Sequence, residues 1–150
     1  MTQAVVAGAL VVAVLNAAAA LVGGWRWYRC EDSGTFWVLL RVGQGSVLTL
    51  ALLIGSLAAA GKYSSDSLFY LYALLPLAIG FVAEQLRVST AQTILDQREL
   101  PNAQAVGGLP EAEQRILVAE IMRRELGVMA TAALVVVFLA LRAAGTAHGF

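Results

Sequence analysis

The chain has 150 residues, with ten basic and ten acidic side chains and no formal net charge at neutral pH. Its composition is 59% hydrophobic and 13% charged, with a mean hydropathy of +0.75, whereas a soluble globular protein is about 25% charged. This excludes an ordinary soluble domain, and the neutral charge excludes nucleic acid as a partner, because nucleic acid requires a clustered basic surface.

The apolar residues fall into four runs, each near the length of about 20 residues that a helix needs to cross a bilayer. The predicted spans are residues 4–22, 36–60, 67–88 and 126–144. We therefore expect an all-α integral membrane protein, a four-helix transmembrane bundle that forms a single domain over residues 1–150. The only cysteine, Cys30, excludes an intrachain disulfide and a cysteine metal cluster.

The first span has one face of small residues. At about 100° per residue, Leu10, Val14 and Leu21 lie opposite a face formed by Ala9, Ala13, Asn16, Ala20 and Gly23. Small residues let membrane helices approach closely, so this face is predicted to pack against the other helices. Asn16 is its polar member, and its simplest role is an interhelical hydrogen bond. The segment lacks the basic start of a signal peptide, so we expect it to be retained.

Basic residues predict the orientation. The first and third connections lie on one side of the membrane and carry Arg26, Arg29, Arg87, Arg98, Arg115, Arg123 and Arg124. The other side carries Lys62 and Arg142. Cytoplasmic loops are enriched in basic residues, so we expect a multi-pass protein of the bacterial inner (plasma) membrane with both termini outside. Aromatic residues around Trp25 and Trp27 mark the cytoplasmic interface.

The second span is the least lipid-like of the four. On a helical wheel, one half holds Val47, Leu50, Ile54 and Leu57, and the other holds Arg41, Gln44, Gly45, Thr49, Gly55, Ser56 and Ala59. We predict that the small, polar half faces the bundle, which adds Gln44, Thr49 and Ser56 to Asn16 as polar residues of the bundle interior. For Arg41 the alternative is that its long side chain extends back to the interface.

The third span contains Pro76, which removes one backbone hydrogen bond and kinks the helix. Such a kink is either a hinge or a static bend, since prolines are also frequent in rigid membrane helices. After this span the sequence becomes polar without a break signal up to PNAQAVGGLP. The order then reverses, with a polar stretch first and the fourth apolar run after it. Residues 88–125 are therefore predicted to extend the last two helices into the cytoplasm as an antiparallel hairpin.

Charged residues of three helices are predicted to lie at one level, just inside the cytoplasmic boundary. They are Arg41, Glu84, Arg87 and Arg124. Opposite charges at this depth relieve one another's desolvation, which predicts a structural ion-pair network. The alternative is a site that binds an anionic head group or passes ions.

The sequence contains no GxSxG, HExxH, CxxC or Walker motif, and its only histidine, His148, lies in the C-terminal tail. We therefore predict no metal and no cofactor. The favoured function is a non-enzymatic accessory, assembly or transport component that contacts membrane lipid and forms a homo-oligomer or a subunit of a membrane complex. The alternative is a membrane enzyme or binding protein for a lipid or quinone-like ligand at the charged layer.

Overall fold

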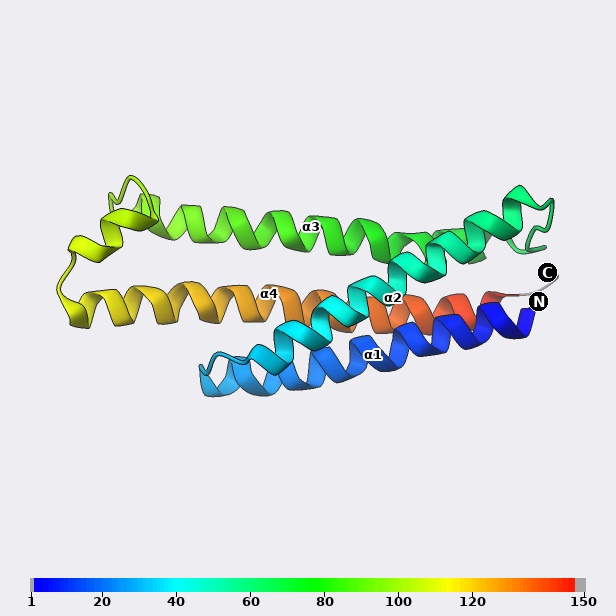
Figure 1. Ribbon diagram of the computed structural model, residues 1–150, viewed down its shortest axis with the longest axis horizontal. Helices are drawn as coiled ribbons and strands as arrows, with labels where there is room; N and C mark the ends of the chain where they lie inside the picture. The colour runs from blue at the N-terminus through cyan, green and yellow to red at the C-terminus, as the bar shows by residue number, and fades with distance from the viewer. Residues whose placement is uncertain (1, 148–150) are drawn as a thin grey trace.

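The computed structural model describes residues 2–147 of the chain (Figure 1). Its long helices are α1 (Thr2–Arg29), α2 (Gly34–Ala59), α3 (Ser67–Gln97) and α4 (Glu111–Thr146), and a short 3₁₀ helix, η1 (Ala103–Gly108), connects α3 to α4. All four long helices are long and apolar enough to cross a membrane. The described residues contain no strand. The predictions of an all-helical chain and of four candidate spans are therefore confirmed.

The four long helices are side by side over part of their length (Figure 1). Helix α1 packs along both α2 and α4, and α3 packs along α4, whereas α2 and α3 contact each other much less. The start of α1, the end of α4 and the α2–α3 connection lie at one end of the molecule. At the other end α3 and α4 continue well beyond α1 and α2.

Local hydrogen bonds define the ends of α1, α2 and α3. After α1, Cys30 adopts a left-handed conformation with φ of 53°, and the Glu31 amide donates to the Arg26 carbonyl at 3.1 Å. The Ser33 hydroxyl then accepts from the Phe36 amide and caps α2. The Asp66 carboxylate caps α3 in the same way, which satisfies amides that have no partner within the first turn of a helix.

Helix α1 buries the face that its sequence predicts. Ala9, Ala13, Asn16 and Gly23 are buried, whereas Leu10, Val14 and Leu21 are exposed. The small residues form holes for larger side chains. A methyl group on Gly8 would lie 3.0 Å from Leu50 Cδ1, and one on Gly23 would overlap the Phe36 ring. The close approach of α1 and α2 therefore depends on glycine in α1 and on large residues in α2.

Helix α2 packs with the face opposite to the predicted one. Its buried residues are Phe36, Leu40, Gly43, Val47, Leu50 and Ile54, whereas Gly45, Thr49, Gly55 and Ser56 are exposed. The predicted placement of Thr49 and Ser56 inside the bundle is therefore wrong. The physical reason is complementarity: α1 already supplies the small side of the contact, so α2 supplies the bulky side chains that fill it.

The extension formed by α3 and α4 has a small apolar core of its own. Ile94, Leu95 and Leu117 are buried in it, with Val106 and Leu109 packed against them from the connection. The Gln114 side chain donates to the Leu109 carbonyl at 2.7 Å and so attaches the connection to α4. Residues 88–97 and 111–125 are thus helical, and the non-helical turns lie between them.

The contact between Gly23 and Phe36 yields a matched pair of substitutions. Gly23→Ala places a methyl group against the Phe36 ring and 3.0 Å from Ala130 Cβ, so we expect overpacking to cost about 1–3 kcal/mol. The neighbouring Gly24 has no atom within 4 Å of the corresponding position, so Gly24→Ala should be neutral or stabilising by up to about 1 kcal/mol. Thermal unfolding in detergent measures both, and equal melting temperatures would contradict this packing.

The core of the extension is tested by Leu117→Ala. Because Leu117 is fully buried, the cavity should destabilise the extension by about 2–5 kcal/mol and accelerate proteolysis and amide exchange across residues 88–125. The adjacent Val118 is 54% exposed, so Val118→Ala is the control and should leave both rates unchanged. Exchange that is already fast across residues 88–97 in the parent protein would show that the extension is not folded.

Candidate functional site

Four polar side chains of α2 and α3 form a connected network, named here the Glu84 network and made of Arg41, Gln44, Glu84 and Arg87. Arg41 Nη1 donates to Glu84 Oε1 at 2.6 Å and to Gln44 Oε1 at 2.7 Å. Gln44 Nε2 donates to the same Glu84 oxygen at 3.1 Å. The second carboxylate oxygen lies 3.4 Å from Arg87 Nε. Both oxygens of Glu84 are therefore engaged by cationic or amide donors.

An aromatic ring completes this network. The Arg87 guanidinium lies over the Trp37 ring, 5.3 Å from its centroid, and the Trp37 indole donates to the Asp32 carboxylate at 3.3 Å. Arg41 remains 53% exposed, and Glu84 and Arg87 are 27% exposed. Partial exposure suits a membrane interface, where long cationic side chains keep contact with water and head groups.

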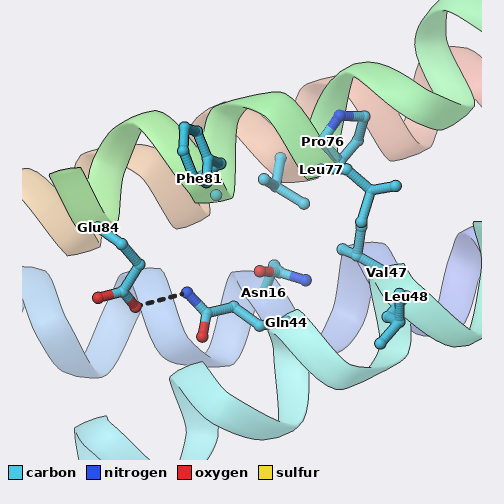
Figure 2. Close-up of a pocket in the computed structure, with 10 residues that line it drawn as sticks. Asn16, Gln44, Val47, Leu48, Pro76, Leu77, Phe81 and Glu84 are labelled. Atoms are coloured by element: carbon cyan, nitrogen blue, oxygen red, sulfur yellow. Dashed lines mark hydrogen bonds between the residues drawn. The ribbon is translucent and has the colours of Figure 1, made fainter.

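The network lies at one end of a crevice between α2 and α3 (Figure 2). The crevice has a volume of about 290 Å³, and most of its lining is apolar, with Val47, Leu48, Pro76, Leu77, Gly80, Phe81 and Val136. Gln44 and Glu84 lie at its polar end, joined by a hydrogen bond. Helix α2 runs diagonally to α3 (Figure 1), and the two helices contact each other little, which leaves space for the crevice.

Asn16 reaches this crevice from α1 and is almost completely buried. Its side-chain amide donates to the Val12 carbonyl at 2.9 Å and, more weakly, to the Gly43 carbonyl of α2 at 3.4 Å. A methyl group on Gly43 would lie 3.0 Å from Asn16 Oδ1. The interhelical hydrogen bond expected of Asn16 is therefore present, and it requires a glycine on the neighbouring helix.

Pro76 is buried and lines the crevice one turn from Gly80. The proline lacks the amide that would bond to the Tyr72 carbonyl. A hinge at Pro76 remains a hypothesis.

Thr49 and Ser56 lie away from the crevice, on the exposed side of α2. Each hydroxyl donates to a backbone carbonyl of its own helix, Thr49 to Gly45 at 2.9 Å and Ser56 to Leu53 at 2.7 Å. These bonds satisfy the hydroxyl groups without a partner helix. Neither residue forms a polar path with Arg41.

Arg124 does not join the Glu84 network. It lies 3.7 Å from Glu120 on its own helix, and Glu120 also pairs at 3.2 Å with Arg98, the residue that follows α3. The predicted single charged layer is therefore two separate groups, one between α2 and α3 and one between α3 and α4. The two groups lie at different levels of the α3–α4 pair, because Arg124 lies beside Thr90, whereas Ala83, next to Glu84, packs with Met129 and Ala133.

Sequence reasoning missed Trp37 and Gly43 as parts of the site. The signal for Gly43 was its position in the series Phe36, Leu40, Gly43, Val47, Leu50 and Ile54, which repeats with alternating spacings of four and three. Such a heptad-like series indicates the packed face of a helix. Trp37 gave no comparable signal, because its stacking on Arg87 depends on how α2 and α3 cross.

Within residues 2–147 no group of three or more histidine, cysteine, aspartate or glutamate side chains is arranged to hold a metal ion. His148 lies outside the described residues. No protein-family model matches the chain, and no match to a curated protein or a solved structure was found.

A double-mutant cycle tests whether the Glu84 network is structural. Arg41→Ala and Glu84→Ala should each lower the melting temperature in detergent, and the double mutant should recover part of the loss. Because Arg41 is half exposed, we expect a coupling energy on the order of 1 kcal/mol. The control cycle uses Arg115 and Glu111, an exposed pair on one helix, whose coupling should be smaller. An Arg41→Ala variant as stable as its parent would contradict a structural role.

Proposed function

We propose that the chain is a non-enzymatic subunit of a membrane assembly, with α2 as the helix that contacts its partner. The support comes from the outer face of α2, named here the outer seam: Val38, Val42, Gly45, Thr49, Leu52 and Ser56. These residues are all exposed, and successive members are four and three residues apart in strict alternation. This is the spacing that keeps one helix in contact with another.

The outer seam has the composition of a membrane helix interface. Gly45 and Thr49 are one turn apart and small enough to let a second helix approach closely. No atom lies within 4 Å of the position that a Cβ on Gly45 would occupy. The inner face of α2 repeats with the same spacing and packs on α1. The proposed partner is a second copy of this chain, because a twofold axis along the membrane normal would pair two outer seams in parallel.

The same geometry supports assembly over transport and catalysis. The buried side chains of the described residues are apolar apart from Asn16 and Ser33, and the Thr49 and Ser56 hydroxyls bond to their own backbone, so one chain offers no buried polar route. Glu84 accepts from Arg41 and Gln44 and pairs with Arg87. Both oxygens of this carboxylate are therefore engaged by side chains of the chain itself, which favours a structural role over a catalytic one.

We also propose a plasma-membrane location, with the α3–α4 extension in the cytoplasm and both termini outside. Two features support this orientation. The arginine-rich first and third connections lie toward one end of the molecule, whereas the α2–α3 connection with Lys62 lies at the other (Figure 1). Basic residues favour the cytoplasmic side. The extension would then place a folded pair of helices in water, available to a cytoplasmic component of the assembly.

Filling the outer seam tests the assembly proposal. Gly45→Leu adds a large side chain where the single chain has free space, so the fold should persist while self-association in detergent weakens by about tenfold, equivalent to about 1.4 kcal/mol. Sedimentation equilibrium measures the association. Gly145→Leu is the matched control, because Gly145 of α4 also has free space around it and lies outside the seam.

Cross-linking identifies the helix that forms the contact. In a Cys30→Ser background, Thr49→Cys should form an intermolecular disulfide, whereas Leu21→Cys on the exposed face of α1 should not. A parent protein that is monomeric, together with a Thr49→Cys variant that cross-links to nothing in native membranes, would contradict the proposal.

Labelling of Cys30 tests the orientation. Cys30 is exposed in the connection between α1 and α2, so a membrane-impermeant maleimide should modify it only after the cytoplasmic side is opened. A cysteine introduced at Ser65, in the α2–α3 connection, should be modified in intact cells. The reverse pattern would invert the topology.

A second candidate is binding of a quinone-like amphiphile in the crevice between α2 and α3. The observation in its favour is the mostly apolar lining with Gln44 and Glu84 at one end, which suits a ligand with a polar ring and an apolar tail. Decylubiquinone should then raise the melting temperature of the parent protein and not that of a Glu84→Gln variant. An equal response of both proteins would exclude a site at this end of the crevice.

A further inference from the structure

A second hollow surface lies on the opposite side of the core, where α1, α3 and α4 meet at the level of Arg124. This basic pocket has a volume of about 530 Å³ and is lined by Trp27, Thr90, Glu120, Arg123, Arg124, Gly127 and Val128. Two apolar grooves begin at the same place. One lies between α1 and α4 and the other between α3 and α4, and Gly127 belongs to the pocket and to both grooves.

The pocket carries excess positive charge. Arg124 shares Glu120 with Arg98, so one carboxylate faces two guanidinium groups. Arg123 has no ion-pair partner among residues 2–147 and is exposed. The lining therefore holds two arginines, Arg123 and Arg124, and one glutamate, which Arg98 also neutralises. An anion of the bilayer surface is the complementary ligand, since basic pockets between membrane helices bind anionic head groups.

The two apolar grooves indicate that the ligand also has apolar chains. The α1–α4 groove has a volume of about 490 Å³ and the α3–α4 groove about 400 Å³. They run along both sides of one exposed ridge of α4, with Thr131 lining both of them. From Arg124 to Val135 the helix rises by about 16 Å, which is close to one leaflet of a hydrocarbon core about 30 Å thick.

Trp27 and Gly127 explain how the pocket and the grooves connect. The Trp27 indole nitrogen lies 3.1 Å from the position that a Cβ on Gly127 would occupy. Any larger residue at 127 would press on the indole and fill the junction. Tryptophan is favoured at the level of the head groups, so this contact marks the boundary between the charged pocket and the apolar grooves.

We propose that this surface binds one anionic diacyl phospholipid, with the phosphate at Arg123 and Arg124 and one acyl chain in each groove. The site is separate from the Glu84 network and from the outer seam of α2, so lipid binding here does not depend on the proposed assembly. A phospholipid here would fill the space between α1, α3 and α4 at the point where the α3–α4 extension leaves the membrane. It would thereby hold the extension in a defined position relative to the bilayer.

Native mass spectrometry of the full chain tests the charge requirement. Dioleoyl phosphatidylglycerol and dioleoyl phosphatidylcholine carry the same acyl chains and differ in net charge, and the anionic lipid should bind at least tenfold more tightly. At about 1 kcal/mol for each arginine near the membrane surface, Arg123→Gln and Arg124→Gln should each weaken its binding about fivefold, and the double variant about thirtyfold. Arg115→Gln, which removes an arginine of α4 far from the pocket, should change nothing.

The acyl-chain requirement has its own pair of variants. Thr131→Phe places an aromatic ring at the ridge that lines both grooves, without changing charge, and should reduce phosphatidylglycerol binding at least fivefold. Leu141→Phe adds an aromatic ring at an exposed position of α4 outside the grooves and should have no effect. Circular dichroism and melting temperature confirm that each variant folds. The arginine variants test recognition of the head group, and the two phenylalanine variants test binding of the acyl chains.

Three outcomes would overturn the proposal. Equal affinity for the two lipids, or wild-type affinity in the Arg123→Gln/Arg124→Gln variant, would show that the pocket does not recognise the anionic head group. Displacement of the lipid by low millimolar inorganic phosphate, with no effect of Thr131→Phe, would show that only an anion binds. A self-associated protein that Thr131→Phe dissociates would show that a second copy of the chain covers the grooves.

Discussion

The close approach of α1 and α2 sets the course of α2 relative to the other candidate membrane spans. Glycine at 8 and 23 leaves holes that Leu50 and Phe36 fill, and Gly43 lets Asn16 reach a carbonyl of the neighbouring helix. In a bilayer, apolar surfaces gain little by leaving lipid, so tight packing and interhelical hydrogen bonds hold helices together. Because α2 is tied to α1 along its inner face, it must cross toward α3 at an angle, and the crevice beside the Glu84 network is the result.

The Glu84 network spans the gap that this crossing leaves. Helices α2 and α3 share few contacts elsewhere, so the bonds from Arg41 and Gln44 to Glu84 are a major link between them near the arginine-rich end. The group around Glu120 also joins two helices, α3 and α4, which in addition pack along each other. Each carboxylate faces more than one arginine, which leaves both groups with positive charge. Such charge is tolerated at the depth of the phosphate head groups and would be costly deeper in the membrane.

Helix α2 has two faces with the same spacing and different partners. The inner face carries Leu40, Val47 and Ile54 and is covered by the chain itself. The outer seam carries Gly45, Thr49 and Ser56, and no other part of the described chain covers it. Hydroxyl groups bonded to their own backbone make this seam compatible with lipid as well as with a partner helix. An assembly formed along it would leave the surface around Trp27, Arg123 and Arg124 open to the bilayer.

The sequence by itself determined the helical class, the four candidate spans and the inward face of α1, because run length and small-residue periodicity depend only on the local chain. It also indicated that Arg41 and Glu84 would lie at the same depth, since depth follows from the distance along each helix. It did not determine which face of α2 turns inward, because that choice depends on the shape that α1 presents. Only the tertiary structure separated Arg124 from Arg41 and brought Trp37 to Arg87 and Trp27 to Gly127. These pairings depend on crossing angles, which arise when side chains of different helices fill one another's gaps.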